Sequence, residues 1–218
     1  MSLLNKTIVL TRVCRLFWCV VLLWGITKAG AWEPEKGKSL FNGTSLDGWE
    51  ITDFTGHGKV SVSDSSIILE KGSRCTGVRY LKKFPKTNYE VTLEAKRVEG
   101  LDFFCGMTFP VKDEFCSLII GGWGGTVVGL SSIDGLDASE NFTGMMKRFR
   151  KNQWYHIMLR VKENKIEAYI NHVNVVDFEL GDHKFSVRSE VRPSRPFGIA
   201  TWKTTGALRR IRLRKLNE

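Results

Sequence analysis

Residues 89–96 read Tyr89-Glu90-Val91-Thr92-Leu93-Glu94-Ala95-Lys96, with an apolar side chain at every odd position and a polar one at every even position. A period of two places the apolar side chains on one face of a β-strand and the polar ones on the other. Similar alternation recurs over residues 155–161, 166–170 and 207–216. After residue 31, no segment has the 3.6-residue period of an amphipathic helix. The pattern predicts an all-β protein.

Short polar turns separate these alternating segments. Glu163-Asn164 and Asn171-His172 each lie between two of them, and Asn suits a hairpin corner because it tolerates positive φ. Half-buried strands joined by short turns are antiparallel and bury their apolar faces by packing sheet on sheet. Many such strands over about 180 residues favour a jelly roll over an immunoglobulin domain. The predicted fold is a two-sheet antiparallel β-sandwich.

The first 31 residues have the pattern of a secretory signal peptide. Met1–Lys28 contains four basic side chains and no acidic one, and residues 16–26 form an apolar run. Ala29-Gly30-Ala31 then provides the small residues of a cleavage site. A membrane-spanning helix needs about 20 apolar residues, so a cleaved signal is favoured over a membrane anchor. We expect an exported protein, periplasmic or extracellular, in which residues 32–218 form one domain without a stable membrane anchor.

The basic charge of the chain points weakly to nucleic acid. The formal net charge is +10, and removal of the four basic residues of the signal peptide leaves +6. Part of this excess lies near the C-terminus, at Arg209, Arg210, Arg212, Arg214 and Lys215. A nucleic-acid-binding protein carries a basic stripe, but an exported protein rarely meets nucleic acid. A solvated strand face accounts for the arginines, so we expect no nucleic-acid partner.

Three cysteines follow the signal peptide: Cys75, Cys105 and Cys116. An odd number argues against a small fold held together by disulfides. Cys105 and Cys116 flank a turn at residues 110–114, so they either pair across a hairpin or are buried as small hydrophobic side chains. The sequence has no C-x-x-C spacing and no histidine cluster beside a cysteine, so no metal site is predicted from these residues.

The middle of the chain is the least strand-like. Residues 121–125 read Gly-Gly-Trp-Gly-Gly, and glycine weakens a strand and often marks a bulge or a close backbone approach. The polar stretch that follows, residues 131–141, is too long for a simple hairpin turn. Long irregular segments on a rigid sandwich frequently carry the binding site. We therefore expect an irregular, ligand-binding region from residue 121 to residue 141.

Residues 37–49, Gly-Lys-Ser-Leu-Phe-Asn-Gly-Thr-Ser-Leu-Asp-Gly-Trp, resemble the opening LFNG-x-x-L-x-GW of the 3-keto-disaccharide hydrolase family. This family of 3-keto-glucoside lyase or hydratase domains falls in the concanavalin A-like lectin/glucanase superfamily. Weaker matches follow in order at residues 84–95, 153–156, 166–176 and 209–214, so that the resemblance covers roughly residues 38–216. The Glu and Gln of the family's G-x-E-x-Q-x-x-D stretch are absent, which indicates a divergent branch.

The resemblance implies cleavage of a sugar that is oxidised at C3. The ketone acidifies the C2 hydrogen, so that a base removes it and the glycosidic oxygen leaves by elimination. Such a site needs a base, a cation or donor for the enolate, and an acid. Glu94, on the polar face of its strand, and Asp102, at the start of the next strand, are the candidates for base and acid. They meet in a cleft if both line the concave side of one sheet. His57, between two glycines, is a third candidate.

Trp123 is the best candidate for binding a sugar, because an indole ring flanked by glycines can stack on a pyranose face in a wet groove. A tryptophan packed in the core would show the same pattern. Arg79 and Arg148 are candidates for holding the enolate or an anionic group. One loop concentrates side-chain oxygen atoms that could bind sugar hydroxyls or calcium, at Asp134, Asp137, Glu140 and Asn141. A loop that is only solvated would show the same composition. Trp49, Trp154 and Trp202 are expected in the core.

Two functions fit the sequence, and both have carbohydrate as the partner. The first is an exported enzyme that cleaves 3-keto-glycosides by elimination or hydrolysis, with calcium as a candidate cofactor. The second is a non-catalytic carbohydrate-binding or adhesion module on the same sandwich. The family resemblance favours the first, and the absence of the family's Glu and Gln favours the second.

Overall fold

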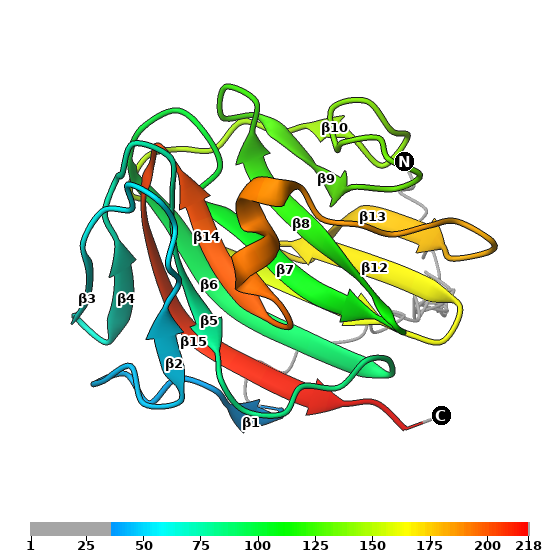
Figure 1. The fold of residues 1–218 in the computed structure, drawn as a ribbon, viewed down its shortest axis with the longest axis horizontal. Coiled ribbons are helices and arrows are strands. Elements are labelled where there is room, and N and C mark those ends of the chain that lie inside the picture. Colours follow the sequence, from blue (N-terminus) through cyan, green and yellow to red (C-terminus); the bar gives the residue numbers. More distant parts are fainter. Residues whose placement is uncertain (1–35, 218) are drawn as a thin grey trace, which may run out of the picture. The chain divides into compact units, whose positions relative to one another are not determined.

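The computed structural model describes residues 36–217. The predicted signal peptide and its cleavage site lie outside these residues. Within residues 36–217, fifteen strands form two antiparallel sheets, accompanied by a single short 3-10 helix. Figure 1 shows the two sheets stacked on each other. The prediction of an all-β, two-sheet antiparallel sandwich is confirmed.

Sheet A has the strand order β13-β12-β11-β6-β15-β4-β3, and β1 also pairs with β15. Its strands are β1 (Lys38–Ser39), β3 (Val60–Ser63), β4 (Ser66–Leu69), β6 (Tyr89–Glu99), β11 (Tyr155–Val161), β12 (Lys165–Ile170), β13 (Val173–Glu179) and β15 (Thr205–Lys215). Sheet B has the order β10-β9-β8-β7-β14-β5-β2. Its strands are β2 (Trp49–Ile51), β5 (Cys75–Tyr80), β7 (Cys105–Val111), β8 (Glu114–Gly122), β9 (Val127–Ser131), β10 (Met145–Met146) and β14 (Gly198–Trp202).

The core fills the space between the sheets, as the period-two pattern requires. Val91, Leu93 and Ala95 of β6 are buried in it. A stacked pair of rings and a buried hydrogen bond add to this core. The rings of Phe84 and Phe197 stack at 4.3 Å between centroids, and the hydroxyl of Tyr89 in β6 donates a hydrogen bond of 2.6 Å to the carbonyl oxygen of Pro110 in β7. Because β6 belongs to sheet A and β7 to sheet B, this hydrogen bond joins the two sheets.

The turn between β12 and β13 forms where the sequence predicts it. Asn171 and His172 have φ values of +48° and +69°, the two successive positive values that a two-residue hairpin of type I′ needs. The backbone N–H of Asn171 donates to the carbonyl oxygen of His156, and the Asn171 side chain accepts from the backbone N–H of His156 at 2.8 Å. The asparagine therefore closes its own hairpin and also fastens it to β11.

The glycine-rich segment corrects one expectation. β8 continues to Gly122 and β9 begins at Val127, so only residues 123–126 form a turn. The prediction of an irregular region is therefore wrong for residues 121–122 and 127–131, which lie in β8 and β9. Residues 132–144 contain no named strand. The glycines are explained by close approach: a Cβ atom at Gly121 would lie 3.2 Å from the Phe104 ring, and one at Gly125 would lie 2.5 Å from the Arg97 guanidinium.

The three cysteines are free and buried. Cys105 faces Ile120 and Cys116 faces Phe109 across the β7–β8 ladder, so the two thiols are not cross-strand partners. The alternative of buried, unpaired side chains is the one that the structure contains. Burial raises the pKa of each thiol to about 12.

The connection from β13 to β14 passes from sheet A to sheet B, and we call residues 180–197 the crossing segment. It contains the 3-10 helix η1 (Ser189–Ser194). Val191 of η1 packs with Phe54, Cys75 and Ala200 in a small apolar cluster. Figure 1 shows η1 lying in front of sheet B. The crossing segment thus covers part of the face of sheet B that points away from the core, here called its outer face. Among the described residues, no helix has the length and apolar character to span a membrane.

Candidate functional site

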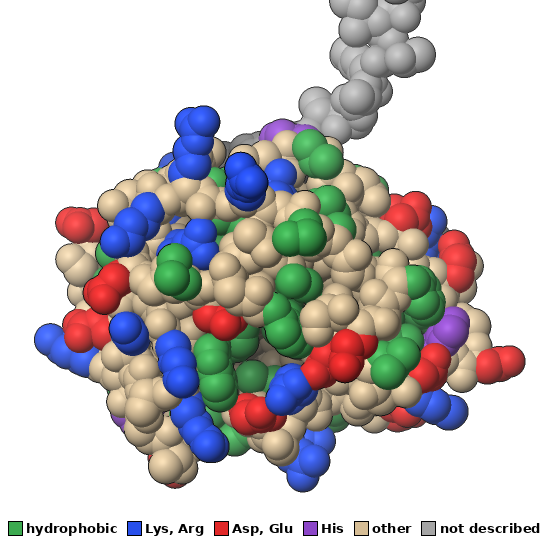
Figure 2. Space-filling view, turned by 90° about the horizontal axis from the view of Figure 1, so that it is seen from above, with side chains coloured by type: hydrophobic (Ala, Val, Ile, Leu, Met, Phe, Trp, Pro, Cys, Tyr) green, Lys and Arg blue, Asp and Glu red, His purple; other side chains and the backbone are tan. Residues whose placement is uncertain are grey.

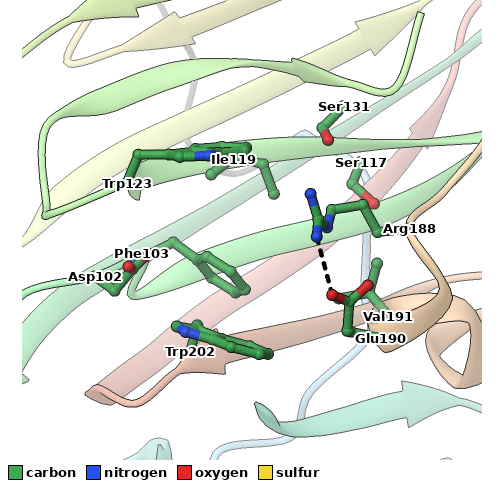
Figure 3. Close-up of a pocket in the computed structure, with 10 residues that line it drawn as sticks. All are labelled: Asp102, Phe103, Ser117, Ile119, Trp123, Ser131, Arg188, Glu190, Val191 and Trp202. Carbon is green, nitrogen blue, oxygen red and sulfur yellow. Dashed lines mark hydrogen bonds and ion pairs between the residues drawn. The ribbon is translucent and has the colours of Figure 1, made fainter. Parts of the chain in front are cut away.

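A pocket of about 220 Å³ lies on the outer face of sheet B. Its side chains come from three places: the strands β8 and β9 with the turn that joins them, the segment before β7 together with the end of β14, and the crossing segment. The lining residues are Asp102, Phe103, Ser117, Ile119, Trp123, Ser131, Arg188, Glu190, Val191 and Trp202. Figure 3 shows them around the pocket.

Aromatic side chains form the walls of this pocket. In Figure 3, Trp123 and Ile119 lie on one side and Phe103 and Trp202 on the other. Trp202 ends β14, and its backbone N–H donates to the carbonyl oxygen of Phe103 at 3.0 Å, which holds these two rings together. Trp123 is 40% exposed and has a φ of +46°. A left-handed conformation at a bulky residue is costly and is often found at functional sites.

Ionised side chains close the opposite end of the pocket. Arg188 donates to Glu190 at 3.0 Å and also forms an ion pair with Asp137. The hydrogen bond from Arg188 lowers the pKa of Glu190, and the same hydrogen bond raises the pKa of Arg188. Glu190 is therefore an anion at neutral pH, in contact with a guanidinium group.

Asp137 lies behind Arg188 and holds it in place. Its carboxylate accepts hydrogen bonds from the hydroxyls of Ser131 and Ser132, at 3.0 and 2.9 Å. Only 14% of the Asp137 side chain is exposed. The chain of contacts Asp137–Arg188–Glu190 fixes the direction in which the guanidinium group points.

Asp102 and Trp123 are the sequence-predicted site residues that line this pocket. Asp102 belongs to the loop between β6 and β7. Its carboxylate accepts from the backbone N–H of Phe103 at 2.7 Å, and its own N–H donates to the hydroxyl of Thr204 at 3.1 Å. These contacts hold the loop that positions Phe103.

Glu94 lies elsewhere, so the predicted meeting of Glu94 and Asp102 in one cleft is wrong. Glu94 points outward from sheet A, where it accepts from Arg209 at 2.6 Å and from Arg210 at 2.9 Å. Both arginines reach it because β15 has a bulge there and Arg210 adopts a φ of +54°. The chain passes from sheet A to sheet B between residues 99 and 105. The two carboxylates therefore lie on different sheets.

Three other predicted residues do not line the pocket. His57 is exposed in the turn after β2, and its Nδ1 atom lies 2.7 Å from the carbonyl oxygen of Gly58. Arg79 on β5 forms an ion pair with Glu50 of the edge strand β2. Arg148 is exposed in the segment that follows β10. The structure does not bring these side chains to the aromatic walls.

The polar loop after β9 uses its oxygen atoms within the protein. Asp134 accepts from His183 at 2.6 Å and from the backbone N–H of Lys184 at 2.9 Å, and these bonds, the backbone one first, lower its pKa. Glu140 accepts from the N–H of Asp137, and Asn141 donates to the carbonyl oxygens of Leu130 and Leu136. In residues 36–217, no group of three or more His, Cys, Asp or Glu is placed to hold a metal ion. The calcium hypothesis therefore finds no ligand set in this loop.

Sequence reasoning missed Arg188, Glu190 and Trp202. Trp202 was expected in the core, but in the structure it is half-buried and lines the pocket. Trp154 also lies outside the core, with the Arg209 guanidinium 4.0 Å and the Lys96 ammonium 4.7 Å from its ring. Trp49 is buried as expected. The signal available in the sequence was the charged, proline-containing stretch at residues 188–196, which interrupts the strand pattern.

Figure 2 looks onto the molecule from the top of Figure 1, the end at which the β8–β9 turn lies. It shows a hollow with hydrophobic side chains inside and charged side chains of both signs around it. An apolar interior with a few polar groups at its edge is the usual composition of a site for a small organic ligand. Aromatic walls with hydroxyl, carboxylate and guanidinium groups suit a sugar ring, which has apolar faces and a polar rim.

Solved structures share the fold. The carbohydrate-binding module CBM66 from Bacillus subtilis matches with a TM-score of 0.54 and 11% identity, over 82% of this chain and 100% of that one. The apo Crh5 transglycosylase matches with a TM-score of 0.56 and 13% identity, over 83% of each chain. A galectin-like protein of unknown function, also from Bacillus subtilis, matches with a TM-score of 0.57 and 10% identity, over 78% and 90%. No curated protein matches the chain.

The fold is a two-sheet antiparallel β-sandwich, which these solved structures share. Residues 36–214 match the family described as the 3-keto-alpha-glucoside-1,2-lyase-like domain, and the chain belongs to this family. It is therefore a carbohydrate-active domain.

Proposed function

We propose that this protein binds a 3-keto-glucoside between Trp123 and Trp202 and cleaves its glycosidic bond by elimination. The observation that carries the proposal is the combination of tryptophans on opposite walls of one pocket with an Arg188–Glu190 pair in the same pocket. The indoles supply flat apolar surfaces for the sugar, and the ion pair supplies the charges that the reaction needs. Family membership supports the choice of a 3-keto sugar.

The reaction needs one base and one cation, and Glu190 and Arg188 have these properties. The Glu190 carboxylate removes the C2 hydrogen as a proton, and the electron pair of that C–H bond forms an enolate with the C3 ketone. The Arg188 guanidinium stabilises the oxygen on which this negative charge develops. The enolate then expels the glycosidic oxygen from C1, and the protonated Glu190 returns its proton to that oxygen. The products are an unsaturated keto sugar and the free leaving group.

Turnover of 3-keto-glucosides tests the proposal. Purified protein is incubated with 3-keto-glucosides and with the unoxidised parent glucosides, and release of the leaving group is followed. We expect release from the keto sugars alone, because only the ketone acidifies the C2 hydrogen. Absence of release, with sugar binding retained, would leave a binding module as the function.

Matched variants assign the site. Glu190→Gln should lower kcat by at least about 100-fold, since it removes the base, while Glu94→Gln on sheet A should leave kcat unchanged. Trp123→Ala and Trp202→Ala should each weaken sugar binding, and Trp154→Ala, which removes an indole on the opposite sheet, should not. Circular dichroism of each variant checks that the fold is intact. If Glu94→Gln lowered kcat as much as Glu190→Gln, or Trp154→Ala weakened sugar binding as much as Trp123→Ala and Trp202→Ala, the pocket would not be the site of the reaction.

We also propose that the protein is exported, since Met1–Lys28 carries the charge and apolar pattern of a signal peptide. Expression of the full chain in a bacterial host, followed by N-terminal sequencing of the protein outside the cytoplasm, tests this. The expected first residue is Trp32. Recovery of the intact Met1 terminus in the cytoplasm would contradict export.

A further inference from the structure

A second cavity, of about 180 Å³, lies beside the pocket and shares two residues with it, Glu190 and Trp202. It is formed by the segment after β2, the start of β5, η1 and the end of β14. Its lining residues are Asp53, Phe54, Thr55, Arg74, Cys75, Ser189, Glu190, Pro193 and Trp202. The two cavities therefore meet at one tryptophan and one carboxylate.

The strand order explains why Trp202 stands between the two cavities. β14 lies between β7 and β5 in sheet B. On the β7 side, the N–H of Trp202 donates to the carbonyl oxygen of Phe103, a wall of the pocket. On the β5 side, Trp202 pairs with Cys75, which lines the second cavity. Trp202 therefore lies between the two cavities, with the Lys203 ammonium 5.9 Å from the centroid of its ring, and residues of η1 line both cavities.

The second cavity has the chemistry of a site for a neutral, hydroxyl-rich ring. Asp53 and Arg74 are exposed and form no ion pair or side-chain hydrogen bond within residues 36–217, so their acceptors and donors are available to a ligand. Thr55 and Ser189 add hydroxyl groups, and the buried Phe54 adds an apolar floor. The opposite charges of Asp53 and Arg74 favour an uncharged partner that both accepts and donates hydrogen bonds.

We propose that the second cavity is the subsite for a sugar leaving group, held by Asp53 and Arg74. This rests on the proposed function. The reacting sugar occupies the pocket, the leaving sugar occupies the second cavity, and the glycosidic oxygen between them lies at Glu190. Glu190 lines both cavities and can therefore reach the C2 hydrogen on one side and the leaving oxygen on the other. Trp202 contacts both rings, and Asp53 and Arg74 determine specificity for the leaving group.

The test compares two substrates that differ only in the leaving group. One is a 3-keto-glucosyl glucose, and the other is methyl 3-keto-glucoside, which has no second ring. Arg74→Ala and Asp53→Ala should each lower kcat/KM for the first substrate by about 10-fold, the value of a lost charge-assisted hydrogen bond. For the methyl glucoside, the change should stay within about 2-fold. Arg79→Ala, which alters an arginine of β5 outside both cavities, is the control and should affect neither substrate.

Equal losses for both substrates, or no loss for either, would overturn the subsite. If wild-type protein turns over neither substrate, the proposed reaction fails, and the subsite is then tested by binding alone. Isothermal titration with the unoxidised disaccharide and with methyl glucoside should give a loss of disaccharide affinity in Arg74→Ala and unchanged affinity for methyl glucoside. A disaccharide affinity that is unchanged in Arg74→Ala would overturn the assignment of the second cavity.

Discussion

Arg188 is shared between two carboxylates, and this arrangement sets the electrostatics of the pocket. Asp137 is held by two serine hydroxyls and forms an ion pair with the guanidinium group, which in turn donates to Glu190. Arg188 is 46% exposed at its side chain and would sample many rotamers without such contacts. The two acidic partners hold it over the pocket, where a ligand can contact it.

The pH dependence of the reaction should follow the contact between Arg188 and Glu190. Glu190 works as a base only when ionised, so kcat/KM falls as the pH drops through its pKa. Arg188→Gln removes the hydrogen bond that lowers this pKa, and the acidic limb of the pH–rate profile should therefore move to higher pH. Arg192→Gln changes an arginine of η1 that does not line the pocket, and it should leave the acidic limb of the pH–rate profile unchanged. If the acidic limb of the Arg188→Gln profile were unchanged from the wild type, or lay at lower pH, Glu190 would not be the base.

Single residues of the site were only partly predictable from sequence. The sequence points to Trp123 because an indole flanked by glycines can stack on a sugar, and to Asp102 because a carboxylate at the start of the strand after Glu94 is a candidate acid or base. Glu94 shows the limit of the method: alternation reveals that a side chain points away from the core, but not from which of the two sheets. Glu190 lies in a segment without periodicity, so nothing in the pattern marked it as a neighbour of Trp123.

At the scale of elements, the β8–β9 hairpin carries Trp123 on three successive left-handed residues. Trp123, Gly124 and Gly125 have φ values of +46°, +85° and +98°. Gly125 also accepts a hydrogen bond from the Arg97 guanidinium at 3.4 Å. Arg97 donates in addition to the carbonyl oxygen of Phe149 at 2.7 Å. The turn is thereby fastened to β6 and to the segment after β10.

The two turn glycines give a matched pair of substitutions. Gly124→Ala meets no atom within 4 Å and should cost only the left-handed backbone strain, about 1–2 kcal/mol. In Gly125→Ala, the new Cβ would lie 2.5 Å from the Arg97 guanidinium and 2.8 Å from the carbonyl oxygen of Leu101. It should therefore destabilise the protein by at least about 1 kcal/mol more than Gly124→Ala. Urea unfolding followed by circular dichroism measures both, and a larger loss in Gly124→Ala would contradict the close packing described here.

Strands were the most predictable elements, and their ends the least. β6, β11, β12 and β15 lie where the alternation predicts strands, because each has one face in the core and one outside. Residues 121–122 and 127–130 were assigned to an irregular region on account of their glycines. In the structure these residues lie in strands, and close neighbours explain the glycines: a Cβ atom at Gly121 would lie 3.2 Å from the Phe104 ring, and one at Gly129 would lie 3.0 Å from the carbonyl oxygen of Thr143. The glycines of that segment are needed because other parts of the chain pack closely against them. Such tertiary contacts cannot be read from the local sequence.

At the scale of the whole molecule, the two sheets share one core, and a buried hydrogen bond from Tyr89 to the carbonyl oxygen of Pro110 crosses it. Tyr89 is fully buried, and burial raises the pKa of its hydroxyl well above the usual value, so the hydroxyl stays protonated and remains a donor. The bond links β6 to β7 across the sandwich. It contributes both to stability and to the register between the layers.

Removal of the Tyr89 hydroxyl should lower the stability of the whole domain. Tyr89→Phe leaves the carbonyl oxygen of Pro110 without that donor in a buried position, and should lower the free energy of unfolding by about 1–3 kcal/mol. Tyr80→Phe is the control, since the Tyr80 hydroxyl makes no hydrogen bond within residues 36–217. Thermal and urea unfolding provide the measurement. An unfolding free energy in Tyr89→Phe equal to that of Tyr80→Phe would mean that the inter-sheet bond does not stabilise the fold.

The crossing segment has an evolutionary consequence. It contributes Arg188 and Glu190, whereas the tryptophans come from the strand framework at the β8–β9 turn and the end of β14. Under the proposed function, affinity and reactivity are therefore encoded in separate stretches of the gene. A single insertion, deletion or recombination within residues 180–197 can exchange the reactive groups while the sugar-stacking surface is inherited unchanged. A lineage with this architecture can thus gain or lose catalysis without rebuilding its scaffold, and binding-only and catalytic descendants can arise from one ancestor.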